Sequence, residues 1–73
     1  MELKIGLKFK KYYNDNNINN IDYCEVRGIV DNYIIVLWCE KKKNKLSSKK
    51  SFYKTIDITD FEYNKDKHIY QPI

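Results

Sequence analysis

A β-hairpin signature around Asp31 and Asn32 constrains the fold more than any other feature of the chain. Two runs rich in β-branched, aromatic and aliphatic residues, 21–30 and 33–41, flank this pair. Asp and Asn tolerate the positive φ values of a type I′ turn, which favours a two-residue loop. In such a hairpin the numbers of facing residues add up to 63. The predicted pairs are Val30 with Tyr33, Gly28 with Ile35, Val26 with Leu37, and Cys24 with Cys39.

These pairs are almost wholly apolar, so the register predicts that they form the core face of the hairpin. The opposite face is mixed, which indicates partial cover; it sets Tyr23, Glu25, Arg27 and Ile29 against Glu40, Trp38, Val36 and Ile34. Gly28 lies inside a strand, where glycine often marks a bulge or a bend.

The rest of the chain predicts further short strands. Apolar and polar residues alternate over residues 3–10, which is the period of a half-buried strand, and an Asn-rich loop follows at 14–20. Residues 52–58 form the next expected strand, residues 57–61 a single 3₁₀ turn, and residues 69–70 the last short element. We therefore expect an all-β chain of five strands, with at most one helical turn, as a single domain over residues 1–73.

The arrangement resembles the SH3-like small barrels, the group that includes Tudor, chromo-barrel and KOW-type modules. The residues that carry the resemblance are 5–9 as a first strand, 23–30 as a bent second strand, 33–38 as the third, and 56–61 running into the turn. The Ala-Leu-Tyr-Asp-Tyr stretch of peptide-binding SH3 domains is not found in the sequence, so proline-rich ligands are not implied. The resemblance implies a closed five-stranded barrel that acts as a non-catalytic binding module.

All of the excess positive charge lies in one segment. The formal net charge is +4, and residues 41–54 contain seven Lys and no acidic residue. Such a loop suits contacts with several phosphates, and lysine gives point charges that recognise the nucleic-acid backbone and not its sequence. Lys, Ile, Asn and Tyr make up 38 of the 73 residues, which indicates an AT-rich genome, so codon bias with a solvated loop is the alternative explanation.

Aromatic residues flank this basic segment, with Trp38 before it and Phe52 and Tyr53 after it. Aromatic rings beside lysines form base-stacking platforms, although the same rings can serve as core packing in a small barrel. The leading hypothesis is a nucleic-acid-binding module. Its candidate residues are Lys41, Lys42, Lys43, Lys45, Lys49, Lys50, Trp38 and Tyr53.

A protein-protein interaction module is the alternative. Seven tyrosines are more than one small core can hold, and Tyr is favoured at protein interfaces, although codon bias also explains its frequency. Tyr12, Tyr13, Tyr23 and Tyr63 are the tyrosines considered for such a surface. An inhibitor or adaptor of the kind encoded by phages and mobile elements fits this alternative.

Other classes of function find little support in the sequence. His68 has no evident nucleophile or acid partner, no Gly-rich phosphate loop is present, and two cysteines with one His do not form a zinc motif, so we expect no enzyme, metal or cofactor. Cys24 and Cys39 are expected to be reduced core thiols. The longest apolar run has seven residues and the N-terminus does not resemble a signal peptide, so a cytoplasmic protein that does not bind membranes is expected.

Overall fold

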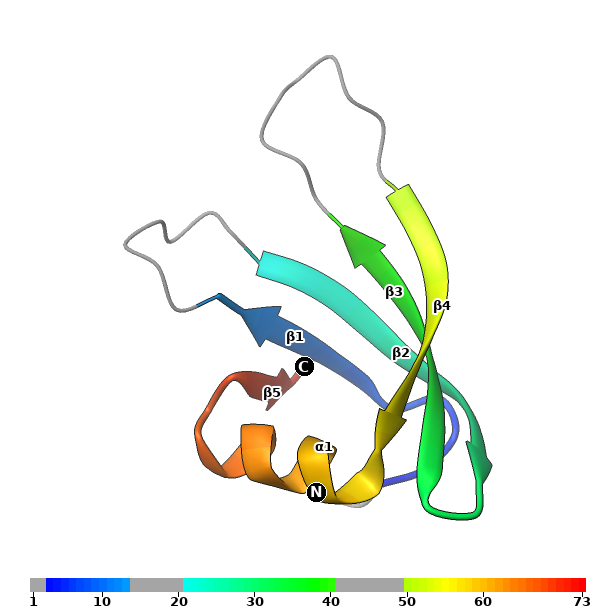
Figure 1. The fold of residues 1–73 in the computed structure, drawn as a ribbon. Helices are drawn as coiled ribbons and strands as arrows, with labels where there is room; N and C mark the ends of the chain where they lie inside the picture. Colours follow the sequence, from blue (N-terminus) through cyan, green and yellow to red (C-terminus); the bar gives the residue numbers. More distant parts are fainter. Residues whose placement is uncertain (1–2, 14–20, 41–49) are drawn as a thin grey trace.

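The computed structural model describes residues 3–13, 21–40 and 50–73, which form one antiparallel sheet and one helix (Figure 1). The elements are β1 (Lys8–Tyr12), β2 (Ile21–Val30), β3 (Tyr33–Glu40), β4 (Lys50–Asp57), α1 (Ile58–Asp66) and β5 (Tyr70–Pro72). The strand order is β4-β3-β2-β1-β5, so the last strand pairs with the first. The mostly β architecture expected from the sequence is confirmed.

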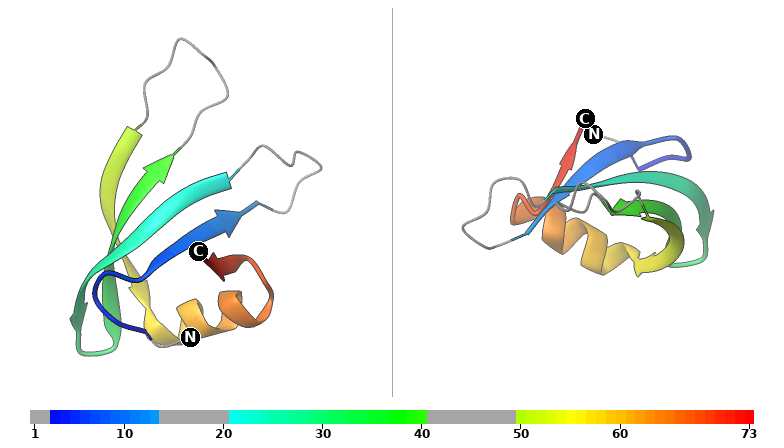
Figure 2. Two further views of the ribbon diagram at one scale, coloured as in Figure 1. Left: turned by 180° about the vertical axis from the view of Figure 1, so that it is seen from behind. Right: turned by 90° about the horizontal axis from the view of Figure 1, so that it is seen from above.

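The expected closed barrel is not formed by these residues. β4 and β5 are the two edge strands of the sheet, and β5 has only three residues. The sheet instead twists and curves around α1, which lies across one of its faces (Figure 2). We call the face that α1 covers the inner face and the opposite one the outer face.

The helix is longer than the predicted single turn, because α1 has nine residues. Asp57 is its N-cap, and the Asp57 carboxylate accepts a hydrogen bond of 2.7 Å from the Thr59 amide. The pattern of residues 57–61 therefore located the start of the helix correctly. Its extent was missed because Phe61 is the one buried residue of α1, so the apolar periodicity that predicts helices is absent.

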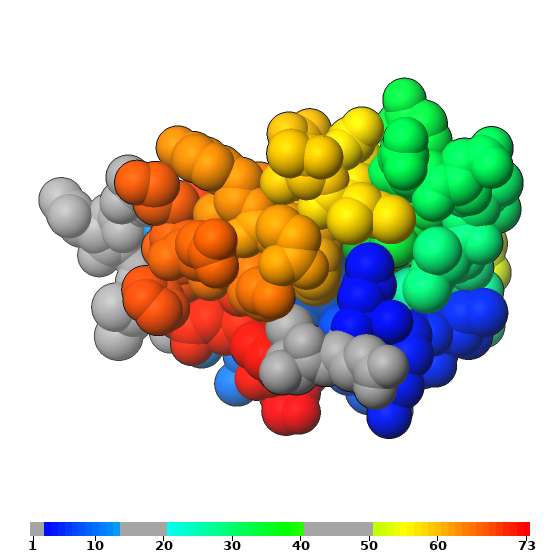
Figure 3. All heavy atoms as spheres, turned by 90° about the horizontal axis from the view of Figure 1, so that it is seen from below, coloured from blue at the N-terminus to red at the C-terminus, as the bar shows by residue number. Residues whose placement is uncertain are grey.

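The predicted first strand is too long at its N-terminus. β1 starts at Lys8, and before it Gly6 has a φ of +95° and the Leu7 amide donates to the Lys4 carbonyl, so the chain turns there. Ile5, which the alternation placed on the buried face, is 64% exposed. Leu3 and Leu7 still pack against the core, and Figure 3 shows this segment in dark blue beside α1 and the hairpin.

A β-bulge changes the register of the central hairpin. Val30 faces Tyr33 and Gly28 faces Ile35 as predicted, but between Val26 and Gly28 the register shifts by one residue. Val26 therefore faces Val36 and not Leu37. Gly28 suits this place because a Cβ there would lie 3.3 Å from the Ile35 Cδ1 atom.

The shift corrects the predicted core face of β3. The buried side chains of this strand are Ile34, Val36 and Trp38, whereas Leu37 is half-buried and Tyr33 is 51% exposed. The prediction was right for β2 before the bulge, where Cys24 and Val26 are buried. One extra residue in β2 exchanges the faces of β3 relative to it, because side chains alternate along a strand.

The turn also differs from the predicted type. Asp31 has a φ of +53°, whereas Asn32 is not among the described residues with positive φ, and a type I′ turn needs both. The Asn32 carbonyl accepts a hydrogen bond of 2.7 Å from the Ile58 amide. The hairpin turn is thus tied to the start of α1.

Aromatic packing fills the space between α1 and the inner face. Phe61 of α1 meets Phe9 of β1 edge-on, with ring centroids 5.2 Å apart, and stacks on Tyr70 of β5 at 5.6 Å. Trp38 meets Tyr70 edge-on at 6.3 Å. This one cluster joins the helix, the first and last strands of the chain and the central hairpin.

Candidate nucleic-acid interface

The outer face presents two rows of side chains that run across the sheet beside the segment that joins β3 to β4. The pairings of the strands define both rows, since facing residues share a face. The row nearer the segment consists of Ser51, Cys39, Tyr23, Lys10 and Gln71. The next row consists of Tyr53, Leu37, Glu25 and Lys8, and the Lys8 carbonyl accepts from the Ile73 amide at the far end.

Two tyrosine rings on this face are open to solvent. Tyr53 is 65% exposed and Tyr23 is 39% exposed. They lie on β4 and β2, with β3 between them, and in neighbouring rows, so their backbones are about 12 Å apart. Two rings at this spacing contact two different bases of a single strand and not the same base.

Lysines of β1 accompany the rings. Lys8 is exposed, and the Lys10 ammonium lies 5.9 Å from the centre of the Tyr23 ring. Glu25 is the acidic residue of the same two rows, and its Oε2 atom forms an ion pair of 3.1 Å with the Arg27 Nε atom. The rows therefore carry positive charge next to aromatic surface, since Arg27 offsets the charge of Glu25.

Most of the lysines predicted as binding residues lie outside the described residues, namely Lys41, Lys42, Lys43, Lys45 and Lys49. Lys50 is the first residue of β4 and faces Glu40, the last residue of β3. Glu40 and Lys50, the described residues on either side of this segment, are therefore next in register to the row of Tyr23. Of the predicted aromatic residues, Tyr53 lies in this interface.

Trp38 does not lie in the interface. Its side chain is 1% exposed on the inner face, where it stacks on Phe52 with ring centroids 6.5 Å apart. The indole Nε1 atom donates a hydrogen bond of 2.8 Å to the buried Asp22 carboxylate. The proposed role of Trp38 as a base-stacking ring is therefore wrong for this structure, and the reason is the register shift at the bulge.

Asp22 organises a polar cluster on the inner face. Its Oδ2 atom also accepts a hydrogen bond from the Tyr13 hydroxyl, and burial together with this contact raises the pKa of Tyr13. The ammonium groups of Lys54 and Lys11 lie 4.5 Å and 5.4 Å from the centre of the Trp38 ring. Burial, and then the charge of Lys54, lowers the pKa of Lys11. The cluster satisfies the buried carboxylate and closes the core at this end.

The two cysteines are free and belong to different faces. Cys24 is buried on the inner face, where burial raises the pKa of its thiol to about 12. Cys39 is half-buried on the outer face, and its Sγ atom lies 3.3 Å from the Ser51 Oγ atom. They do not face each other, because Cys24 pairs with Trp38 and Cys39 with Tyr23. The expectation of two facing core thiols was thus wrong for Cys39.

Sequence analysis did not select Lys8 and Lys10 as binding residues. The signal was present, since both occupy the polar positions of the alternating stretch that became β1, and alternation places such residues on the solvent face. Tyr23 was noted as a surface tyrosine, but its position beside the basic segment depends on the bulge.

Comparison with known proteins gives no match: no family model, curated protein or solved structure matches the chain. Among residues 3–13, 21–40 and 50–73, no helix is long and apolar enough to cross a membrane. Within the same ranges, no three His, Cys, Asp or Glu side chains gather in a group suited to a metal ion.

Proposed function

We propose that the protein is a small non-catalytic module that binds single-stranded nucleic acid across the outer face of its sheet. The observation that carries this proposal is the pair of exposed rings, Tyr23 and Tyr53, on the outer face at the end of the sheet where the Lys-rich segment is attached, with the Lys10 ammonium over the Tyr23 ring. The rings stack on bases, and the ammonium groups neutralise phosphates.

We also propose that the fold is a member of the SH3-like group in an open form. Two features support this assignment: four strands form a meander whose first strand pairs with the fifth, and a helix connects β4 to β5. The basic segment then corresponds to a hairpin loop at one end of the sheet. This assignment concerns the fold, and the binding proposal rests on the outer face itself.

The direct test is fluorescence anisotropy with labelled single-stranded and duplex oligonucleotides, of DNA and of RNA, over a range of salt concentrations. Four phosphate contacts predict a slope of log K against log salt of about −3 for single strands. Tyr53→Ala and Tyr23→Ala are each expected to weaken binding by about 1–3 kcal/mol. Changing Lys42, Lys43 and Lys45 together to Gln is expected to flatten the slope by about two.

Tyr63→Ala is the matched control. Tyr63 is 61% exposed, like Tyr53, but it lies on α1, away from the outer face. The proposal fails if no oligonucleotide binds at low salt, or if Tyr63→Ala weakens binding as much as Tyr53→Ala.

A second candidate function, docking of a protein partner, is favoured by a different surface. The outer face at the tip of the β2–β3 hairpin exposes Val30 (55%) and Tyr33 (51%), and an open cavity lies between Tyr33, Ile35 and Thr55. Apolar side chains exposed together are typical of protein interfaces. If this surface is the functional one, Val30→Lys with Tyr33→Lys abolishes the retention of a specific partner in affinity capture and leaves oligonucleotide binding unchanged.

A further inference from the structure

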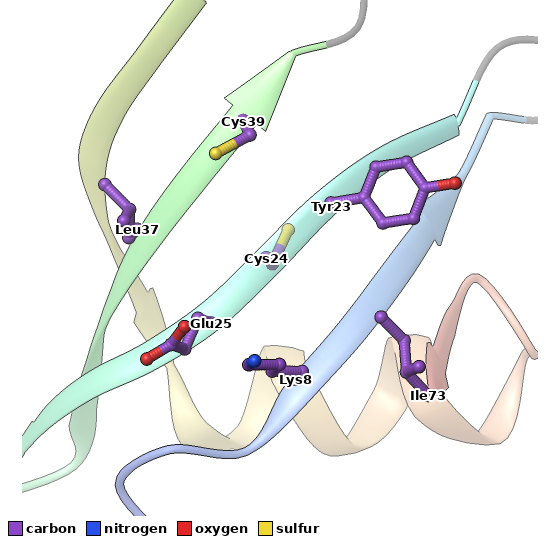
Figure 4. A pocket seen from close by; sticks show the side chains of 7 residues that line it. All are labelled: Lys8, Tyr23, Cys24, Glu25, Leu37, Cys39 and Ile73. Carbon is purple, nitrogen blue, oxygen red and sulfur yellow. The ribbon is translucent and has the colours of Figure 1, made fainter.

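A small cavity opens on the outer face between Tyr23 and the C-terminal residue (Figure 4). Its volume is about 180 Å³, and its lining comes from β1, β2, β3 and the residue that follows β5. The lining residues are Lys8, Tyr23, Cys24, Glu25, Leu37, Cys39 and Ile73. Five of the seven lining residues, all except Cys24 and Ile73, belong to the two rows that form the proposed interface.

Most of the wall is apolar or aromatic. Leu37 and Cys39 line one side, Ile73 the other, and the Tyr23 ring lies along the cavity (Figure 4). A flat heterocycle suits such walls, because it buries its faces against apolar groups while its edge stays available for hydrogen bonds.

Two charged side chains stand next to each other at this cavity. Glu25 and Lys8 face each other directly in the register of β1 and β2, so their Cβ atoms are about 5 Å apart. A carboxylate only accepts hydrogen bonds, whereas an ammonium only donates them. The ion pair of Glu25 with Arg27 uses Oε2, and a carboxylate has a second oxygen with which to accept. The cavity therefore presents an acceptor beside a donor.

We infer that this cavity holds one base of the bound strand and favours cytosine over thymine or uracil; the inference rests on the proposed function. The edge of cytosine offers an amino group beside an acceptor, which complements Glu25 beside Lys8. Thymine and uracil have a carbonyl oxygen in place of the amino group, and this oxygen repels the Glu25 carboxylate. Adenine also offers an amino group beside an acceptor, but its larger ring stacks differently, so the two pyrimidines give the clean comparison.

The test measures the dissociation constants of 15-nucleotide homopolymers, with cytosine against thymine in DNA and cytosine against uracil in RNA. The cytosine polymer is expected to bind about 5- to 10-fold more tightly than the thymine polymer in DNA and the uracil polymer in RNA. One hydrogen bond to a charged group in a solvated site contributes a factor of this size. A preference in only one sugar identifies that nucleic acid as the natural ligand. Glu25→Gln is expected to reduce the ratio to about 1–2, since an amide both donates and accepts.

Two variants distinguish a direct contact between Glu25 and the base from a general effect of charge on binding. Arg27→Gln breaks the ion pair but keeps the Glu25 carboxylate, so the preference for cytosine is expected to remain. Glu62→Gln makes the same charge change on α1 and is expected to alter the affinity for both polymers equally. Equal binding of cytosine and thymine polymers by the wild-type protein overturns the inference and leaves the proposed function intact. The absence of binding to any polymer refutes the proposed function as well.

Discussion

The two faces of the sheet use aromatic residues in opposite ways. Trp38 on β3 is covered by Phe52 and the polar cluster around Asp22, whereas Tyr53, the residue that follows Phe52, is the most exposed aromatic side chain of β4. The two rings are neighbours in register but face opposite sides. Both rings are close in sequence to the basic segment. The face of the strand on which each ring lies therefore decides whether a ligand can reach it.

The largest expected difference is between the losses of stability on truncating these two rings. Trp38→Ala removes a buried ring and leaves the Asp22 carboxylate without its indole donor, so we expect a loss of about 3–5 kcal/mol in the free energy of unfolding. Tyr53→Ala is expected to cost about 0.5 kcal/mol or less. Urea denaturation followed by circular dichroism measures both, and equal losses would contradict the division between the faces.

A second test uses two adjacent isoleucines of β3. Ile34 is fully buried and Ile35 is half-buried on the outer face. Ile34→Ala is expected to cost about 2–5 kcal/mol and Ile35→Ala about 1 kcal/mol, because a cavity forms only in the core. A larger loss of thermal stability for Ile35→Ala than for Ile34→Ala would instead support the register without a bulge, in which Ile35 is the core residue.

The smallest effect is the part of the pH dependence of stability that the inner-face thiol contributes. Burial raises the pKa of Cys24 to about 12 from an ordinary value of 9.0, so the unfolded chain loses this proton first as the pH rises. The contribution of Cys24 to stability is complete below pH 9 and is lost as the pH rises from 9 to about 12.

Cys24→Ala isolates this contribution, because the other titrating groups remain the same. Denaturation at pH 9.5 and 10.5 should show a shallower decline for Cys24→Ala than for the wild-type protein. Parallel declines would mean that the thiol is as accessible in the folded protein as in the unfolded one.

Local patterns in the sequence predicted the strands and the hairpin well. Alternation identified β1 from Lys8 onward, the pair Asp31–Asn32 marked the turn, and Asp57 marked the start of α1. Each of these features depends on a few neighbouring residues, which is why sequence reasoning finds them.

The remaining features depend on contacts between distant segments. Gly28 suggested a bulge but gave neither its place nor its effect on the faces, so Trp38 was assigned to the wrong side. The length of α1 escaped notice because its attachment to the sheet relies on Phe61 packing against Phe9 and Tyr70, and not on a repeated apolar stripe. The same holds for the candidate site. Tyr53 was among the binding residues predicted from the sequence, whereas the lysines of β1 were not.

The bulge between Val26 and Gly28 has a consequence for how the gene tolerates small insertions and deletions. Arg27 is the extra residue of β2, since Val26 pairs with Val36 and the next pair joins Gly28 to Ile35. Deleting Arg27 leaves these pairs in one continuous ladder, so every side chain of β2 keeps its present face. Deleting Glu25 instead moves either Cys24 or Val26 to the opposite face. A three-nucleotide deletion at the Arg27 codon is therefore expected to damage the protein less than one at the Glu25 codon, which takes a core side chain out of the inner face.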